Sequence, residues 1–240
     1  MTTVDVVIPV YNEEHVLAQS VATLRDFLKA NLDKQWKILI ADNASTDGTW
    51  EVAQGLDKEY PDVVAVHIDQ KGRGRALRKV WLESDSDIVS YMDVDLSTGL
   101  DAFPKIIQAI EEGYGVATGS RLMGSSDVKR SFKRELTSRG YNFIIKALFF
   151  TKWHDAQCGF KAVSRKAVDE LVPLIQNQEW FFDTELLILA GMKGYKIKEV
   201  PVTWVEDTDT RVDIMKTVRE DLGGLMRLRF RPIPKTKKLE

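Results

Sequence analysis

The chain has 240 residues, of which 44% are hydrophobic and 29% are charged, and its net charge is -2. This composition provides one large hydrophobic core and excludes an intrinsically disordered chain. The overall charge gives no reason to expect nucleic acid as a partner, and the single cysteine, Cys158, excludes an internal disulfide.

Apolar runs and amphipathic segments alternate over the first 120 residues. The apolar runs predict strands at residues 4–10, 36–41, 63–68, 87–92 and 115–119. Helical spacing predicts helices at residues 12–30, 46–60, 71–84 and 103–112, with Asn12 as the N-cap of the first. Such alternation predicts an α/β fold with a mostly parallel sheet flanked by helices.

The second half of the chain is less regular. Its patterns predict helices at residues 135–150, 164–174, 182–192 and 212–228, and strands at 155–163 and within 195–204. The last helix is amphipathic and basic. We therefore expect one domain at residues 1–210, followed by a basic C-terminal helix and tail at 211–240 that faces a membrane.

Two segments are strongly basic although the rest of the chain is acidic. Residues 121–146 hold seven Lys or Arg against two acids, and residues 211–238 hold nine against three. Either an anionic partner binds one face or these are solvated helix surfaces. The longest apolar stretch, residues 141–150, is too short to span a bilayer. We expect peripheral membrane contact, with a membrane partner or a transmembrane segment outside this sequence as alternatives.

Polar clusters follow four of the predicted strands. Ligands of parallel α/β sheets bind beyond the carboxyl ends of the strands, so four clusters in succession favour a binding site over ordinary loops. The clusters are Tyr11-Asn12-Glu13, Asp42-Asn43, Gln70-Lys71-Gly72 and Asp93-Val94-Asp95.

Two of these clusters suggest a metal-bound diphosphate. The carboxylates of Asp93 and Asp95 are unfavourable side by side unless a cation neutralises them, and oxygen ligands favour Mg²⁺ or Mn²⁺. The alternative is an ordinary loop with helix caps. Residues 71–75, Lys-Gly-Arg-Gly-Arg, offer backbone amides and cationic side chains at a helix start, which suits a diphosphate.

Taken in order, residues 6–13, 41–49 and 93–95 resemble the signature of family 2 glycosyltransferases, which have the Rossmann-like GT-A fold. The resemblance implies a nucleoside diphosphate-sugar donor and an Mg²⁺ or Mn²⁺ ion held by Asp93 and Asp95. The residues expected to bind the nucleotide-sugar are Pro9, Tyr11, Glu13, Asp42, Lys71 and Asp93.

Residues 119–121, 155–161, 180–187 and 202–204 resemble the dolichyl-phosphate glucosyltransferase branch, which is close to the mannose synthases. This implies transfer of a hexose, glucose from UDP-glucose, to a polyprenyl or dolichyl phosphate with inversion. It also implies a cytoplasmic enzyme associated with the cytoplasmic face of a membrane. The expected catalytic residues are Asp93, Asp95 and Arg121, and the expected ligands of the acceptor phosphate are Arg121, Arg134, Arg139 and Arg211.

The chain departs from this branch at two positions. Ser97 stands where some mannose synthases place a glutamine as a third metal ligand, and the loop around Arg211 is more acidic than is usual.

A phosphate acceptor is already anionic near neutral pH and needs no general base. We therefore expect Asp183 and Glu185 to stabilise the fold or to orient basic residues rather than to abstract a proton. Two readings of the same fold stay open: GDP-mannose as donor, or a sugar hydroxyl as acceptor, which needs a base such as Asp155 or Asp183. A third is a catalytically inactive nucleotide-sugar binding module attached to a membrane partner, against which the intact Asp93 and Asp95 argue.

Overall fold

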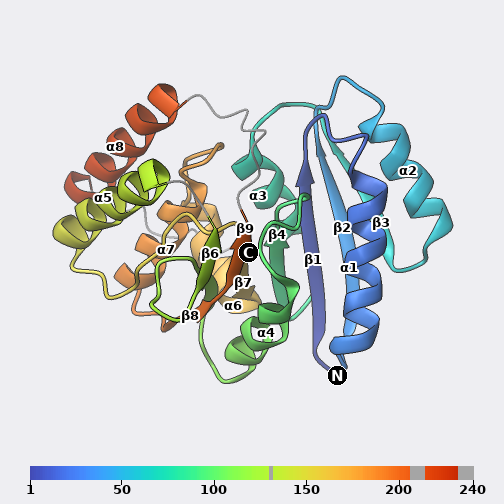
Figure 1. Cartoon of the computed structure of the whole chain (residues 1–240), viewed down its shortest axis with the longest axis horizontal. Helices are drawn as coiled ribbons and strands as arrows, with labels where there is room; N and C mark the ends of the chain where they lie inside the picture. The colour runs from blue at the N-terminus through green and yellow to red at the C-terminus, as the bar shows by residue number, and fades with distance from the viewer. Residues whose placement is uncertain (130–131, 206–213, 232–240) are drawn as a thin grey trace.

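The computed structural model describes residues 1–129, 132–205 and 214–231. Seven strands form one sheet in the order β3-β2-β1-β4-β7-β5-β8, shown in Figure 1. Their bounds are β1 Thr3–Val10, β2 Gln35–Asn43, β3 Val63–Ile68, β4 Ile88–Met92, β5 Val116–Ser120, β7 Phe160–Ser164 and β8 Ile197–Pro201. A separate parallel pair consists of β6, Asp127–Lys129, and β9, Thr203–Val205.

The sheet is mostly parallel, as predicted. Strands β1 to β4 are parallel to one another, and β5 is parallel to β8. Strand β7 is the exception, because it runs antiparallel between β4 and β5. The sequence predicted this strand at residues 155–163, but residues 155–159 precede it as a loop at the carboxyl end of β4.

Helices cover both faces of the sheet. One core cluster packs α1, α2 and α4 on one face, and a second packs α3, α6 and α7 on the other. Strand β1 serves both, since Val6 belongs to the first cluster and Val7 to the second. The helices are α1 Leu17–Asn31, α2 Thr49–Glu59, α3 Arg73–Glu83, α4 Phe103–Glu111, α5 Phe132–Phe149, α6 Arg165–Leu171, α7 Phe182–Met192 and α8 Ile214–Phe230, with short 3₁₀ turns at Leu100–Ala102 and Val172–Leu174.

The predicted start of the first helix is wrong. Helix α1 begins at Leu17, and Asn12 has a φ of 56°, in the left-handed region rather than the extended region of an N-cap. The Asn12 side chain instead accepts a hydrogen bond from the amide of Thr46 at 2.8 Å. The turn after β1 is therefore tied to the turn after β2, which brings the first two polar clusters together.

Helices α5 and α8 pack beside each other at one end of the molecule, at the left of Figure 1. The inner side of α8 is buried at Leu225 and Leu228, and Arg227 pairs with Glu185 of α7 at 2.9 Å. In the described ranges, every helix is too short or too polar to cross a bilayer.

Candidate active site

The four predicted polar clusters meet at one edge of the sheet. Because β1, β2, β3 and β4 are parallel neighbours, their carboxyl ends lie together. Pro9, half-buried near the end of β1, pairs in register with Ala41. The ammonium of Lys71 lies 3.6 Å from the ring centroid of Tyr11 and joins the third cluster to the first.

Asp42 is enclosed at the end of β2. Its side chain is fully buried, and one carboxylate oxygen lies 2.7 Å from Nδ1 of His67 while the other accepts from the amide of Ser45 at 3.3 Å. The half-exposed His67 ring lies against Trp50, with ring centroids 5.0 Å apart. The sequence did not identify His67 and Trp50 as candidate site residues. His67 could have been found from the alignment of the parallel strands β2 and β3, because it lies opposite Asp42.

Glu13, predicted to bind the nucleoside, lies in the turn after β1. Its amide donates to the hydroxyl of Thr49 at 2.8 Å, at the start of α2. The neighbouring Glu14 accepts from the amide of Gly48 at 2.8 Å. The Glu14 carboxylate therefore sits at the start of α2, where the helix dipole favours it, and the Glu13 backbone is tied to the same turn.

The two carboxylates of the Asp93-Val94-Asp95 motif are not equivalent. Asp93 accepts from Nη2 of Arg73 at 2.9 Å, so the protein supplies the cation that offsets its charge. Its other oxygen rests on the backbone of Gly159, where an added Cβ would lie 2.0 Å from it. Asp95 is exposed and accepts from the amide of Ser97 at 2.9 Å.

Beneath Asp93 lies a buried network centred on Asp183 of α7. Asp183 accepts from Nη1 of Arg73 at 2.7 Å and from the hydroxyl of Tyr91, and the ammonium of Lys161 is 3.1 Å away. Burial favours the neutral acid, but Lys161 and Arg73 hold the pKa of Asp183 below its usual value. The network thus joins α3, α7 and β7 under the candidate metal site.

The predicted diphosphate cradle at residues 71–75 is partly wrong. The amide of Gly72 donates to Asn43 at 2.8 Å, and the amide of Arg75 donates to the carbonyl of Gln178 at 3.0 Å. Gly72 has a φ of 150°, and a Cβ there would lie 2.6 Å from that same carbonyl. The two glycines therefore leave room for the segment before α7. Arg73 pairs with Asp93 and with the buried Asp183, so Lys71 remains as the predicted phosphate ligand.

Arg121 follows β5 at the same edge of the sheet and is held by Asp155. Its Nε and Nη2 donate to the two carboxylate oxygens at 2.8 and 3.0 Å, and its amide donates to the same group at 3.0 Å. Burial opposes the charge of Asp155, but the Arg121 guanidinium lowers the pKa of Asp155 to about 2. Asp155 is therefore ionised at neutral pH and holds the Arg121 side chain in place.

The other predicted acceptor arginines are less closely placed. Arg139 on α5 is exposed and pairs with Glu135, one helical turn away, at 2.7 Å. Arg134 lies near the start of the same helix. Arg211 lies outside the described residues.

The oxygen atoms of Asp93 and Asp95 fit a hard cation better than zinc. Among residues 1–129, 132–205 and 214–231, no group of three or more His, Cys, Asp or Glu side chains could hold a metal ion. Zinc sites need three or four protein ligands, whereas Mg²⁺ binds through one or two carboxylates with water and substrate phosphates. The residues present therefore fit an Mg²⁺ or Mn²⁺ ion that arrives with a diphosphate.

Asp221 of α8 is a buried carboxylate beside the loop that carries Asp155. It is 4% exposed, and it accepts from Nε2 of Gln157 at 3.4 Å. Burial raises the pKa of Asp221 to about 6, against a hydrogen bond to Tyr141 that lowers it, and Glu220 and Asp183 raise it further. Compared with the unfolded chain, the folded state therefore keeps Asp221 protonated up to a higher pH.

Replacing Asp221 with asparagine is expected to stabilise the protein at alkaline pH. The folded pKa lies above an unfolded value of about 3.9, so the stability that this group contributes is present below about pH 4 and lost as pH rises through 6. Asp221→Asn should raise the free energy of unfolding by about 2 kcal/mol at pH 8 and leave it unchanged near pH 4. Urea unfolding at both pH values measures this, with the exposed Asp85→Asn as control; an equal gain at both pH values would contradict it.

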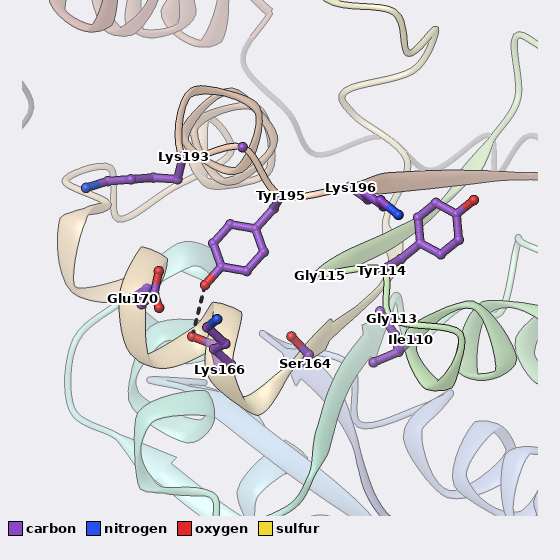
Figure 2. Close-up of a pocket in the computed structure, with 11 residues that line it drawn as sticks. Ile110, Gly113, Tyr114, Gly115, Ser164, Lys166, Glu170, Lys193, Tyr195 and Lys196 are labelled. Atoms are coloured by element: carbon purple, nitrogen blue, oxygen red, sulfur yellow. Dashed lines mark hydrogen bonds between the residues drawn. The ribbon is translucent and has the colours of Figure 1, made fainter.

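A cavity of about 450 Å³ lies at the opposite edge of the sheet, where β5 begins (Figure 2). Tyr114, Ser164, Tyr195 and several lysines line it. Ser164 pairs with Ile88 at the amino end of β4, so this cavity is remote from Asp93 at the carboxyl end. It contains none of the predicted site residues.

A family model described as glycosyl transferase family 2 matches residues 5–172. Glycosyltransferase AglD of Haloferax volcanii is 34% identical over 221 residues, which cover 90% of this chain and 35% of that protein. Dolichyl-phosphate beta-glucosyltransferase of Saccharomyces cerevisiae is 30% identical, covering 84% and 66%. Dolichol-phosphate mannosyltransferase of Pyrococcus furiosus is 31% identical, covering 84% and 56%. The chain therefore spans about a third to two thirds of these relatives.

Glucosyl-3-phosphoglycerate synthase from Mycobacterium tuberculosis has a similar structure, solved in complex with Mn²⁺ and UDP-glucose. The TM-score is 0.71 at 18% identity, and the match covers 98% of this chain and 81% of that one. This likeness supports the predicted GT-A fold.

Proposed function

This chain belongs to glycosyl transferase family 2, and we propose that it transfers glucose from UDP-glucose to the phosphate of a polyprenyl lipid such as dolichyl phosphate, with inversion. We place the reaction at the cytoplasmic face of a membrane. The dolichyl-phosphate beta-glucosyltransferases among its relatives support this acceptor and this sugar.

The observation that carries the proposal is the state of the buried carboxylates beside Asp93. Asp155 is paired with Arg121, and Asp183 is paired with Arg73 and Lys161. Both have a lowered pKa, so neither is suited to accept a proton from a sugar hydroxyl. An acceptor that brings its own negative charge needs no such base.

In the proposed reaction an oxygen of the acceptor phosphate attacks the anomeric carbon of the sugar. The bond from that carbon to the diphosphate breaks, and the nucleoside diphosphate leaves without any proton transfer. A divalent cation held by Asp95 and Asp93 would offset the charge that develops on the leaving diphosphate. Lys71 would contact the same group.

The two ends of the site would bind the rest of the substrates. His67 and Trp50 would contact the nucleoside, and the buried Asp42 would orient the His67 ring from behind. Arg121 would bind the acceptor phosphate through the guanidinium edge that faces away from Asp155. The hydrogen bonds from Nε and Nη2 of Arg121 to Asp155 fix the direction of that edge.

Nucleotide binding tests the donor. UDP with Mn²⁺ at 100 times its dissociation constant should stabilise the protein by about 2.7 kcal/mol, which raises the melting temperature by roughly 5–10 °C. Stabilisation by GDP and GDP-mannose in place of UDP would transfer the proposal to a mannosyl donor, for which the Pyrococcus furiosus relative is the precedent.

Product formation tests the acceptor. Incubation with UDP-glucose, Mn²⁺ and a prenyl phosphate should release UDP and yield a glucosyl phospholipid. If transfer occurs only to a sugar hydroxyl, and Asp155→Asn abolishes it while UDP-glucose still binds, the base-free reaction is wrong. If no nucleoside diphosphate is released with any donor and any lipid acceptor in the presence of Mn²⁺, the chain is a nucleotide-sugar binding module.

A further inference from the structure

Exposed apolar side chains are concentrated on the two neighbouring helices α5 and α8. Eight of the fourteen large hydrophobic residues that are exposed in the described ranges lie on these helices or directly after α5. Monomeric soluble proteins rarely carry apolar groups together in this way unless they mark an interaction surface. The members used below, which define the docking face, are Leu136, Phe143, Val218, Leu222, Met226 and Phe230.

The docking face consists of one stripe on each helix. The four α8 residues recur every fourth position, so they share one side of that helix. On α5, Leu136 and Phe143 are seven residues apart and also share a side. The inner sides are anchored in the core, because Ile145 and Leu225 are fully buried. Each helix is therefore apolar on its outer as well as its inner side.

Positive charge accompanies the apolar stripes. Among the described side chains of these helices and of the residue after α8, four arginines are exposed: Arg139, Arg219, Arg229 and Arg231. Arg139 pairs with Glu135 on its own helix, whereas Arg227 lies on the inner side of α8 and pairs with Glu185. None of the three described acids of these helices is exposed, and Asp221 is buried. The centre of a protein–protein interface is depleted of charge, whereas helices that lie on membranes combine apolar side chains with Lys and Arg. We infer that the docking face binds the surface of an anionic phospholipid bilayer.

Both helices contact the loop that holds Arg121. The Asn142 side chain of α5 accepts from the amide of Ala156 at 2.9 Å, and Gln157 donates to Asp221 of α8 at 3.4 Å. Asp155 in the same loop clamps Arg121. If the proposed function holds, a bilayer on the docking face presents its lipid phosphate on the side of the molecule where Arg121 is braced.

Vesicle co-sedimentation of the full chain tests this surface. The protein should bind vesicles of phosphatidylcholine and phosphatidylserine more tightly than phosphatidylcholine alone, and high salt should weaken the binding. Leu222→Ser/Met226→Ser/Phe230→Ser should lower the partition by about 100-fold. Arg219→Gln/Arg229→Gln should lower it only on anionic vesicles, by about fivefold for each arginine.

The matched control is Val16→Ser/Leu82→Ser/Met192→Ser, which removes three similarly exposed side chains from other helices or turns. It should leave vesicle binding unchanged. The inference is overturned if wild type does not bind anionic vesicles, if the control loses as much binding as the α8 triple variant, or if light scattering shows that the α8 substitutions dissociate a dimer and leave vesicle binding intact.

A soluble short-chain prenyl phosphate separates this inference from the proposed function. Without vesicles, the α8 triple variant should transfer glucose to it within about twofold of wild type, because the bilayer is no longer needed. Vesicle binding without transfer to any lipid phosphate contradicts the function alone. Transfer without vesicle binding contradicts the docking face alone.

Discussion

Asp95→Asn is expected to lower the rate of glucose transfer by about 1,000-fold while the protein stays folded. Asp95 is exposed, so its replacement leaves the core intact. The amide cannot offset the charge of a divalent cation, and that ion is worth several kcal/mol of stabilisation to a leaving diphosphate, or about three orders of magnitude in rate. UDP release from UDP-glucose and prenyl phosphate, measured across an Mn²⁺ titration, gives both the rate and the metal dependence.

Asp93→Asn should differ from Asp95→Asn in one respect. Asp93 also neutralises Arg73, so its loss removes charge balance from a buried arginine as well as a metal ligand. We expect the same loss of rate together with a lower melting temperature. Asp101→Asn, which replaces another exposed acid a few residues on, is the control. Full activity of Asp95→Asn at low Mn²⁺ would refute the metal site.

The sequence was sufficient for the sheet because its strands are buried on both faces. Val6 and Val7 of β1 face opposite core clusters, and such continuous apolar runs identify parallel strands without knowledge of their neighbours. Short connections then place the polar clusters at one edge. The antiparallel β7 was placed too early because the apolar residues before Phe160 pack in a loop at the site, and periodicity does not distinguish the two.

The interior of the site could not be predicted because it depends on partners far apart in the sequence. Arg73 resembles a phosphate ligand when it is flanked by glycines, yet it is buried by α7, more than 100 residues later, and pairs with Asp183. Gly72 resembles an anion cradle for the same reason, yet its lack of a Cβ admits the carbonyl of Gln178. Only the tertiary structure distinguishes a bare amide that meets a ligand from one that meets another segment of the chain.

Asp183→Asn is expected to destabilise the protein by about 3–5 kcal/mol at neutral pH, which is the cost of breaking a buried ion pair and leaving its partner charged. Here two buried cations, Arg73 and Lys161, lose their shared carboxylate. A protein of this size has roughly 5–15 kcal/mol of stability in total, so the melting temperature should fall by about 10 °C or more. Asp169→Asn removes the exposed partner of Arg165 and should change stability by less than about 1 kcal/mol.

The pH dependence identifies ionisation of Asp183 as the cause of this loss. Its folded pKa is lowered, so its contribution to stability is present above the unfolded value of about 3.9 and disappears as pH falls through the folded pKa. The gap in unfolding free energy between wild type and Asp183→Asn, measured in urea, should therefore be full at pH 7 and shrink below pH 4. A gap that stays constant with pH would assign the loss to packing. Because Arg73 also holds Asp93, the variant that still folds at low temperature should need more Mn²⁺ for half-maximal rate, which a purely structural role far from the site would not require.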